Sequence, residues 1–175
     1  TINRSISLKG NGLHSGKKCK IKFLPGELGS GIQFKRVDKK NKPIIEAIIE
    51  NVIDTTRGTS IGNNKVRIIT VEHVLAALYG LGVDNIMIEI DNIEPPILDG
   101  SSKPYVEAIL KVGLSEQSLH KSELIIDQTV TYSNQKTGVD IHIVPSDRFR
   151  ITYMMDYKFQ ALGTQYSNYY SVTEE

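Results

Sequence analysis

Apolar and polar residues alternate strictly between residues 18 and 23. Cys19, Ile21 and Phe23 alternate with lysines, which is the period of two that a strand with one buried face produces. Weaker or shorter versions of the pattern predict further strands at residues 2–8, 31–36, 44–49, 66–69 and 85–91. Glycine, proline and asparagine residues separate these segments and predict the turns between them.

Two segments have the spacing of amphipathic helices instead. Val71, Val74, Leu75 and Leu78 follow Thr70 at i, i+3, i+4 and i+7, so we expect a helix with Thr70 as its N-cap. The pattern stops at a pair of glycines, Gly80 and Gly82. The second helix is predicted after residues 99–102, with Pro104 in its first turn, an apolar face from Tyr105 to Leu110, and Gly113 at its end.

A polar segment without periodicity, residues 115–122, separates two parts of the chain. We expect a first domain at residues 1–118 and a second at residues 119–175. The second contains four strand-like runs, at residues 124–132, 138–144, 149–157 and 164–172, which predict a four-stranded sheet with no helix to cover its apolar face. The fold class is therefore α+β, and the second domain is expected to stop before its helices. Its uncovered strands are expected to be disordered, to self-associate or to be stabilised by another copy.

Composition narrows the class of protein. Of the 175 residues, 39% are hydrophobic and 23% charged, as in globular proteins, and the net charge of +1 gives no whole-chain attraction to nucleic acid. No transmembrane segment and no signal peptide is visible. The single cysteine, Cys19, excludes an internal disulfide and any thiolate cluster for zinc, and it is compatible with a cytoplasmic protein. The chain begins at Thr1, which indicates a piece of a longer protein.

The strongest candidate for chemistry is the pair Glu72–His73 in the first turn of the first helix. The helix dipole at that end favours a carboxylate and disfavours imidazolium, so His73 is kept neutral, as a metal ligand must be. His73 could bind zinc and Glu72 could activate a water molecule. The alternative is that Glu72 complements the dipole and His73 only packs. Catalytic zinc usually has three protein ligands, and three cannot be assembled from this sequence.

Other polar clusters have structural explanations that compete with functional ones. The segment from Gly12 to Gly16, which contains His14, suits either a binding loop or a plain turn. Asp99 is interpreted as the residue that closes the turn entering the second helix. Eight basic residues between Lys18 and Lys42 form either a solvated outer face or a surface for phosphate.

Five blocks in sequence resemble one family. They are residues 10–16 (GNGLHSG), 54–60 (DTTRGTS), 70–78 (TVEHVLAAL), 80–86 (GLGVDNI) and 96–102 (PILDGSS). The chain resembles the N-terminal half of the zinc-dependent UDP-3-O-acyl-N-acetylglucosamine deacetylases of lipid A biosynthesis, the LpxC family. The likeness is strong over residues 2–113 and looser over residues 122–175.

The resemblance implies two similar α+β domains in which a small sheet carries two helices, with the active site between the domains. It implies Glu72 as the catalytic base, His73 as one zinc ligand, and Thr56 and Thr59 as residues that line the substrate site. His14 and Asp99 are assigned structural roles. The remaining zinc ligands belong to a later helix of the family that this chain does not contain, so we expect the chain alone to hold no catalytic zinc tightly and to be inactive.

The resemblance also sets the expected partners. It implies UDP-3-O-acyl-N-acetylglucosamine as the substrate of the intact enzyme, and it implies neither a nucleic-acid partner nor a transmembrane segment. The expected location is the cytoplasm of a Gram-negative bacterium. Some members of the family are fused to a hydroxyacyl-dehydratase domain. The alternative from the residues alone is a non-enzymatic α+β module that binds RNA or a nucleotide through its basic N-terminal strands.

Overall fold

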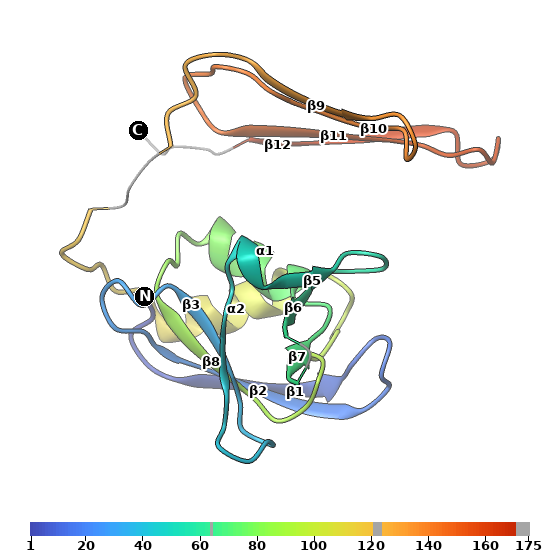
Figure 1. Cartoon of the computed structure of the whole chain (residues 1–175). Helices are drawn as coiled ribbons and strands as arrows, with labels where there is room; N and C mark the ends of the chain where they lie inside the picture. Colours follow the sequence, from blue (N-terminus) through green and yellow to red (C-terminus); the bar gives the residue numbers. More distant parts are fainter. Residues whose placement is uncertain (64, 121–123, 171–175) are drawn as a thin grey trace. The chain divides into compact units, whose positions relative to one another are not determined.

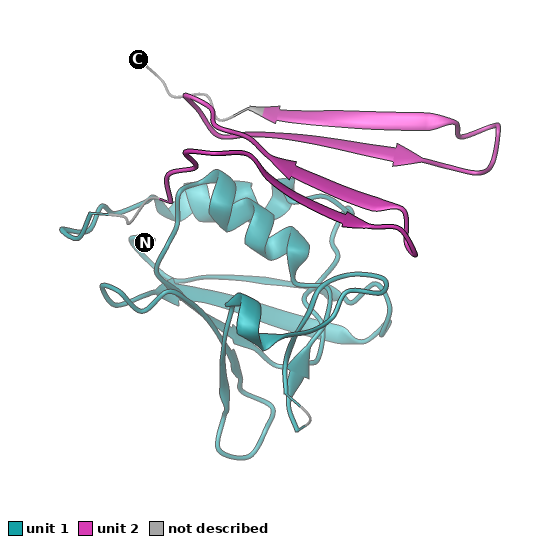
Figure 2. Ribbon diagram, turned by 45° about the horizontal axis from the view of Figure 1, so that its top comes forward, with its two compact units in different colours: residues 1–120 teal, residues 121–175 magenta. Residues whose placement is uncertain are grey.

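The computed structural model describes residues 1–63, 65–120 and 124–170, and it divides into two compact units, residues 1–120 and 121–175 (Figure 2). Asn64 of the predicted turn before the strand at residues 66–69, and residues 171–172 of the last predicted strand, lie outside the described residues.

Unit 1 is built on a five-stranded sheet in the order β1-β2-β8-β3-β4, counted over the described residues (Figure 1). The strands are β1 (Ile6–Asn11), β2 (Lys18–Pro25), β3 (Ile32–Arg36), β4 (Ile44–Glu46) and β8 (Ile86–Ile90). Strands β3 and β8 pair in parallel and the other neighbours are antiparallel. The alternation from Lys18 to Phe23 is confirmed, since Cys19, Ile21 and Phe23 are buried and the outer face is lysine.

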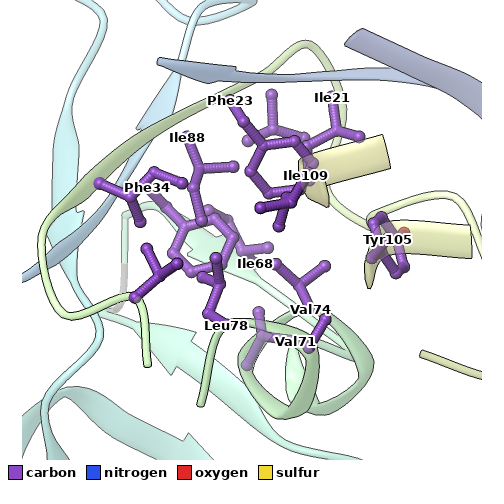
Figure 3. Packing of buried hydrophobic residues seen from close by; sticks show 14 of the residues in the cluster. Ile21, Phe23, Phe34, Ile68, Val71, Val74, Leu78, Ile88, Tyr105 and Ile109 are labelled. Atoms are coloured by element: carbon purple, nitrogen blue, oxygen red, sulfur yellow. The ribbon is translucent and has the colours of Figure 1, made fainter. Parts of the chain in front are cut away.

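Two helices cover the apolar face of this sheet, α1 (Glu72–Gly80) and α2 (Lys103–Val112) (Figure 1). Figure 3 shows Phe23, Phe34 and Ile88 of the sheet facing Val74 and Leu78 of α1 and Ile109 of α2. The rings of Phe23 and Tyr105 meet edge to face with centroids 6.1 Å apart. Each fully buried side chain of this size contributes roughly 1.5–3 kcal/mol, so the faces predicted from the periodicity supply most of the driving force for unit 1.

The ends of the helices correct one expectation and confirm others. Thr70 is not the N-cap of α1: that position is occupied by Val71, and Thr70 has a left-handed backbone with φ of 57°. The Thr70 hydroxyl instead donates to the buried carboxylate of Glu94, which has the stronger need for a donor. At α2, Pro104 lies in the first turn, Gly113 is the C-cap, and Asp99 accepts hydrogen bonds from Ser101 in the entry turn, as predicted.

The remaining segments of unit 1 form a small sheet beside the main one. Strands β5 (Val52–Asp54), β6 (Ser60–Gly62) and β7 (Arg67–Ile68) pair in that order, and a short 3-10 helix η1 (Ile49–Asn51) precedes them. The strand predicted at residues 44–49 is therefore shorter than expected. The strand predicted at residues 2–8 is instead β1 at Ile6–Asn11, and Ile2 forms a separate bridge with Leu114 after α2.

Unit 2 corrects the predicted four-stranded sheet. Its strands β9 (Val130–Asn134), β10 (Val139–Ile143), β11 (Arg150–Asp156) and β12 (Thr164–Tyr170) form two separate hairpins among the described residues. Short local turns close each hairpin, for example through Gly138 N–H donating to the carbonyl of Asn134. Alternation predicts each strand and its turn, but it does not specify pairing between hairpins. Large apolar side chains of both hairpins are exposed, as expected.

Within the described residues, no helix is both long and apolar enough to cross a membrane.

Candidate functional site

The start of helix α1 is attached to the polar segment between β5 and β6. The N–H of Val71 donates to the carbonyl of Thr59 at 3.2 Å, and the N–H of Thr59 donates to Oε2 of Glu72 at 2.8 Å. Residues 54–60 and 70–78, two separate blocks of the sequence, are thus connected by the two backbone hydrogen bonds of Thr59. Glu72 is consequently held by the backbone, in the first turn of a helix, rather than by a flexible ion pair.

Gly58 leaves the space that the Glu72 carboxylate occupies. Its φ of +146° lies in a region that residues with a side chain rarely adopt. A Cβ atom at this position would lie 2.9 Å from Oε1 of Glu72. The glycine in the Asp54–Ser60 segment therefore serves both the backbone conformation and the approach of the carboxylate.

The two predicted substrate-lining threonines differ in their surroundings. Thr59 is half-buried and contacts Glu72 through its backbone. Thr56 is exposed, and its hydroxyl and N–H both donate to Oδ1 of Asp54, at 2.6 and 3.0 Å. The hydrogen bond from the Thr56 hydroxyl is the largest of the causes that lower the pKa of Asp54. The structure therefore brings Thr59 to Glu72 and ties Thr56 into the turn at Asp54.

A buried carboxylate that the sequence analysis missed links this region to the glycine-rich loop. Glu94 has an exposed fraction of 0%, and its oxygens accept the N–H of His14 at 2.9 Å, the N–H of Ser15 at 2.7 Å, and the hydroxyl of Thr70 at 3.0 Å. Burial raises the pKa of Glu94, but the hydrogen bonds together lower it by more, so the pKa lies below its usual value.

Glu94 explains why the loop contains Gly12. A Cβ atom at Gly12 would lie 2.3 Å from Oε2 of Glu94, so no side chain fits there. His14 contributes its backbone N–H while its side chain is exposed, which agrees with the structural role expected for it. A signal for Glu94 was present in the sequence, since it is one carboxylate within an apolar run that continues into Pro95 and Pro96.

The structure places the predicted metal ligand, His73, at the start of a helix. His73 is half-buried beside Glu72 in the first turn of α1. Within residues 1–63, 65–120 and 124–170, no group of three or more histidine, cysteine, aspartate or glutamate side chains could hold a metal ion. Burial, with the nearby charge of Asp91, raises the pKa of Cys19 to about 12, so a thiolate ligand is disfavoured. One imidazole next to one carboxylate fits part of a zinc site and needs further ligands.

Comparisons with known proteins identify the family. The chain matches the family model described as "LpxC: UDP-3-O-acyl N-acetylglycosamine deacetylase" over residues 1–175. It is 47% identical over its whole length to a protein of Chlorobaculum tepidum named "Bifunctional enzyme LpxC/FabZ", covering 38% of that relative. It is 38% identical to a protein of the same name from Bacteroides thetaiotaomicron, over 95% of this chain and 36% of the relative.

A third relative carries the name of the deacetylase alone. The chain is 37% identical to the "UDP-3-O-acyl-N-acetylglucosamine deacetylase" of Trichormus variabilis, over 99% of this chain and 62% of that protein. The chain thus spans less than two thirds of the length of each of these relatives. The RNA-binding alternative finds no support in these comparisons. On the match along all of its residues, the chain belongs to the LpxC family of UDP-3-O-acyl N-acetylglycosamine deacetylases.

Proposed function

We propose that this chain forms one side of the active site of a cytoplasmic zinc-dependent deacetylase, which removes the N-acetyl group from UDP-3-O-acyl-N-acetylglucosamine in lipid A biosynthesis. The observation that carries the proposal is the hydrogen bond from Thr59 N–H to Glu72 Oε2, because it holds a carboxylate beside His73 in the manner expected of a catalytic base. Family membership over the whole chain and the names of the relatives support the same reaction.

Glu72 acts on the attacking water. Oε2 accepts the hydrogen bond from Thr59, so the second oxygen, Oε1, is the basic atom that takes a proton from the water. At the same time the water oxygen bonds to the acetamide carbonyl carbon. The C–N bond then breaks, the sugar nitrogen gains a proton, and acetate and the free amine leave. Thr59 has a positioning role through its backbone, and Thr56 is proposed to line the substrate site nearby.

His73 is proposed as one zinc ligand. When bound, zinc supplies Lewis-acid polarisation of the acetamide carbonyl and of the water. His73 is half-buried in the first turn of α1, and a ring nitrogen of its neutral imidazole would bind the metal. The other ligands are proposed to come from the second domain of the longer relatives. Residues 119–175 are proposed as the start of that domain.

The experiment compares the 175-residue chain with a version extended to the length of its relatives. We expect one zinc per extended protein by metal analysis, acetate release by that form only, and a large loss of turnover with nearly unchanged substrate affinity in Glu72→Gln. His73→Ala is expected to lower the zinc content. Acetate release by the 175-residue chain would show that the site is assembled from other residues, and full turnover by Glu72→Gln would remove Glu72 as the base.

A further inference from the structure

A second candidate site lies in unit 1, in a pocket of about 560 Å³ that none of Glu72, His73, Thr56 or Thr59 lines. Its walls come from segments far apart in the sequence: the loop before β2, the end of β3 and the turn after it, the hairpin between β6 and β7, and the residues after β8. The charged side chains that line it are Lys17, Arg36, Asp38, Lys39, Lys65 and Arg67. Five basic residues and one acidic residue thus line this pocket, in a chain whose net charge is only +1.

Arg36 gives this pocket a fixed wall. Only 3% of Arg36 is exposed, and its guanidinium donates through Nε and Nη2 to the two oxygens of Asp38, both at 2.8 Å. Nη1 donates to the backbone carbonyl of Arg67 at 2.6 Å. This hydrogen bonding lowers the pKa of Asp38, which stays ionised and holds the planar group in place. A buried arginine paired in this way is held rigidly, so this part of the pocket wall is fixed.

Hydrogen bonds hold the backbone at three other basic residues of the pocket, Lys17, Lys65 and Arg67. In the hairpin, the side chain of Asn63 accepts the N–H groups of Lys65 and Val66, at 2.9 and 3.0 Å, and Arg67 is fixed by the bond from Arg36. In the loop before β2, the carbonyl of Lys17 accepts the N–H of Gly12 at 3.0 Å. The side chains of Lys17, Lys65 and Arg67 are exposed. They can therefore contact a ligand while the hydrogen bonds of their backbone stay in place.

We propose that this pocket binds a small molecule bearing a diphosphate group. Lysine and arginine residues from separate segments line the pocket, and these residue types are the usual recognition elements for phosphate, which arginine can bind with two hydrogen bonds. The volume falls within the range of small-molecule sites and exceeds what one orthophosphate fills. The single carboxylate, Asp38, is already paired with Arg36 and also lies 3.9 Å from Lys39. The inference goes beyond the proposed deacetylase chemistry and does not depend on it.

Titration calorimetry of the full chain with inorganic pyrophosphate tests the proposal. We expect one saturable site that weakens at least tenfold in the double variant Lys65→Gln/Arg67→Gln and with rising salt. The matched control Lys111→Gln/Lys158→Gln removes the same charge from exposed positions outside the pocket and should change the affinity less than twofold. Circular dichroism melting verifies that both variants are folded. Glu72→Gln should bind pyrophosphate as the unaltered chain does, which separates this site from the proposed catalytic one.

Two further probes identify the source of the diphosphate. Displacement of pyrophosphate by UDP would assign the site to a nucleotide-linked diphosphate, and binding of pyrophosphate without displacement by UDP would assign it to another soluble diphosphate. Equal affinity in the pocket variant and in the control would overturn the proposal. Binding to phosphatidylglycerol vesicles without any binding of pyrophosphate would overturn it as well, in favour of a lipid headgroup.

Discussion

The backbone N–H of Thr59 lies 2.8 Å from Oε2 of Glu72 and donates to it, across thirteen positions in the sequence. This bond fixes one oxygen of the carboxylate and leaves the direction of the other to the backbone around Gly58. The relationship is specific to the tertiary structure, because Thr59 precedes β6 while Glu72 begins α1. It makes the local conformation of the segment from Asp54 to Ser60 a determinant of how the proposed base is aimed.

Replacing Gly58 with alanine should impair the reaction more than the fold. The new Cβ would lie 2.9 Å from Oε1 of Glu72 and would displace it, and the φ of +146° would be strained by about 1–3 kcal/mol. We expect turnover of the intact deacetylase to fall about a hundredfold, as a displacement near 1 Å can cause. Steady-state kinetics and urea unfolding measure the two effects separately.

Gly29→Ala is the matched control for this variant. Gly29 also has a left-handed backbone, with φ of +76°, but a Cβ there would meet nothing within 4 Å. It should therefore lose stability of similar order and keep its turnover. An equal loss of turnover in both variants would mean that strain alone, and not contact with Glu72, limits the reaction.

Glu94→Gln should destabilise the first unit although it preserves shape. The amide NH₂ of glutamine would replace a carboxylate oxygen that accepts a hydrogen bond, so a donor would face the N–H of His14 or Ser15. Leaving such a buried group unpaired costs about 1–3 kcal/mol. Urea unfolding measures the loss, with Glu107→Gln as the control because its ion pair with Lys103 is exposed. A loss in Glu94→Gln no larger than in Glu107→Gln would contradict the role assigned to Glu94.

Glu94 should also make stability depend on pH in the acid range. Burial raises its pKa, but the hydrogen bonds from His14, Ser15 and Thr70 hold it below the ordinary value of 4.5. The unfolded chain then binds the proton more readily than the folded one, so the stabilisation is complete above the ordinary value and is lost as the pH falls through the folded pKa.

We therefore expect the free energy of unfolding to decline as the pH falls below the ordinary carboxyl pKa of 4.5, and to decline less steeply in Glu94→Gln. Asp38, whose pKa is lowered by Arg36, contributes a decline of the same sign that remains in the variant. Parallel pH profiles for the two proteins would show that Glu94 gains no proton on unfolding in this range.

The hairpins of unit 2 should drive self-association of the 175-residue chain. In the β9–β10 hairpin, Ile141 lies opposite Tyr132 and Ile143 opposite Val130, which places four exposed apolar side chains on one face. Exposed strands with such a face associate readily. Light scattering should report a rise of apparent mass with concentration, and Ile141→Lys/Ile143→Lys should suppress it. Thr131→Lys/His142→Lys, on the opposite face, is the control, and a monomer at all concentrations would contradict the prediction.

Much of the first unit could be predicted because its signals are local. The alternation from Lys18 to Phe23 and the spacing of Val71, Val74 and Leu78 gave the correct faces, since a strand and a helix each repeat with a fixed period. The end of α2 at Gly113 and the turn at Asp99 followed from residue chemistry alone. Thr70 was wrong as an N-cap because the demand of a distant buried carboxylate decided its conformation and its hydrogen bond.

The sequence by itself determined the two helices and most strands of unit 1. Through five ordered blocks it also determined the family, and it singled out Glu72–His73 as the candidate pair. Only the tertiary structure decided that Thr59 meets Glu72, that Glu94 joins the glycine-rich loop to Thr70, and that Arg36 and Lys65 line one pocket. It also decided that the strands of unit 2 form two hairpins rather than one sheet. The physical reason is range: periodicity and capping act over a few residues, whereas pairing between strands and the burial of a charge depend on partners far away in the chain.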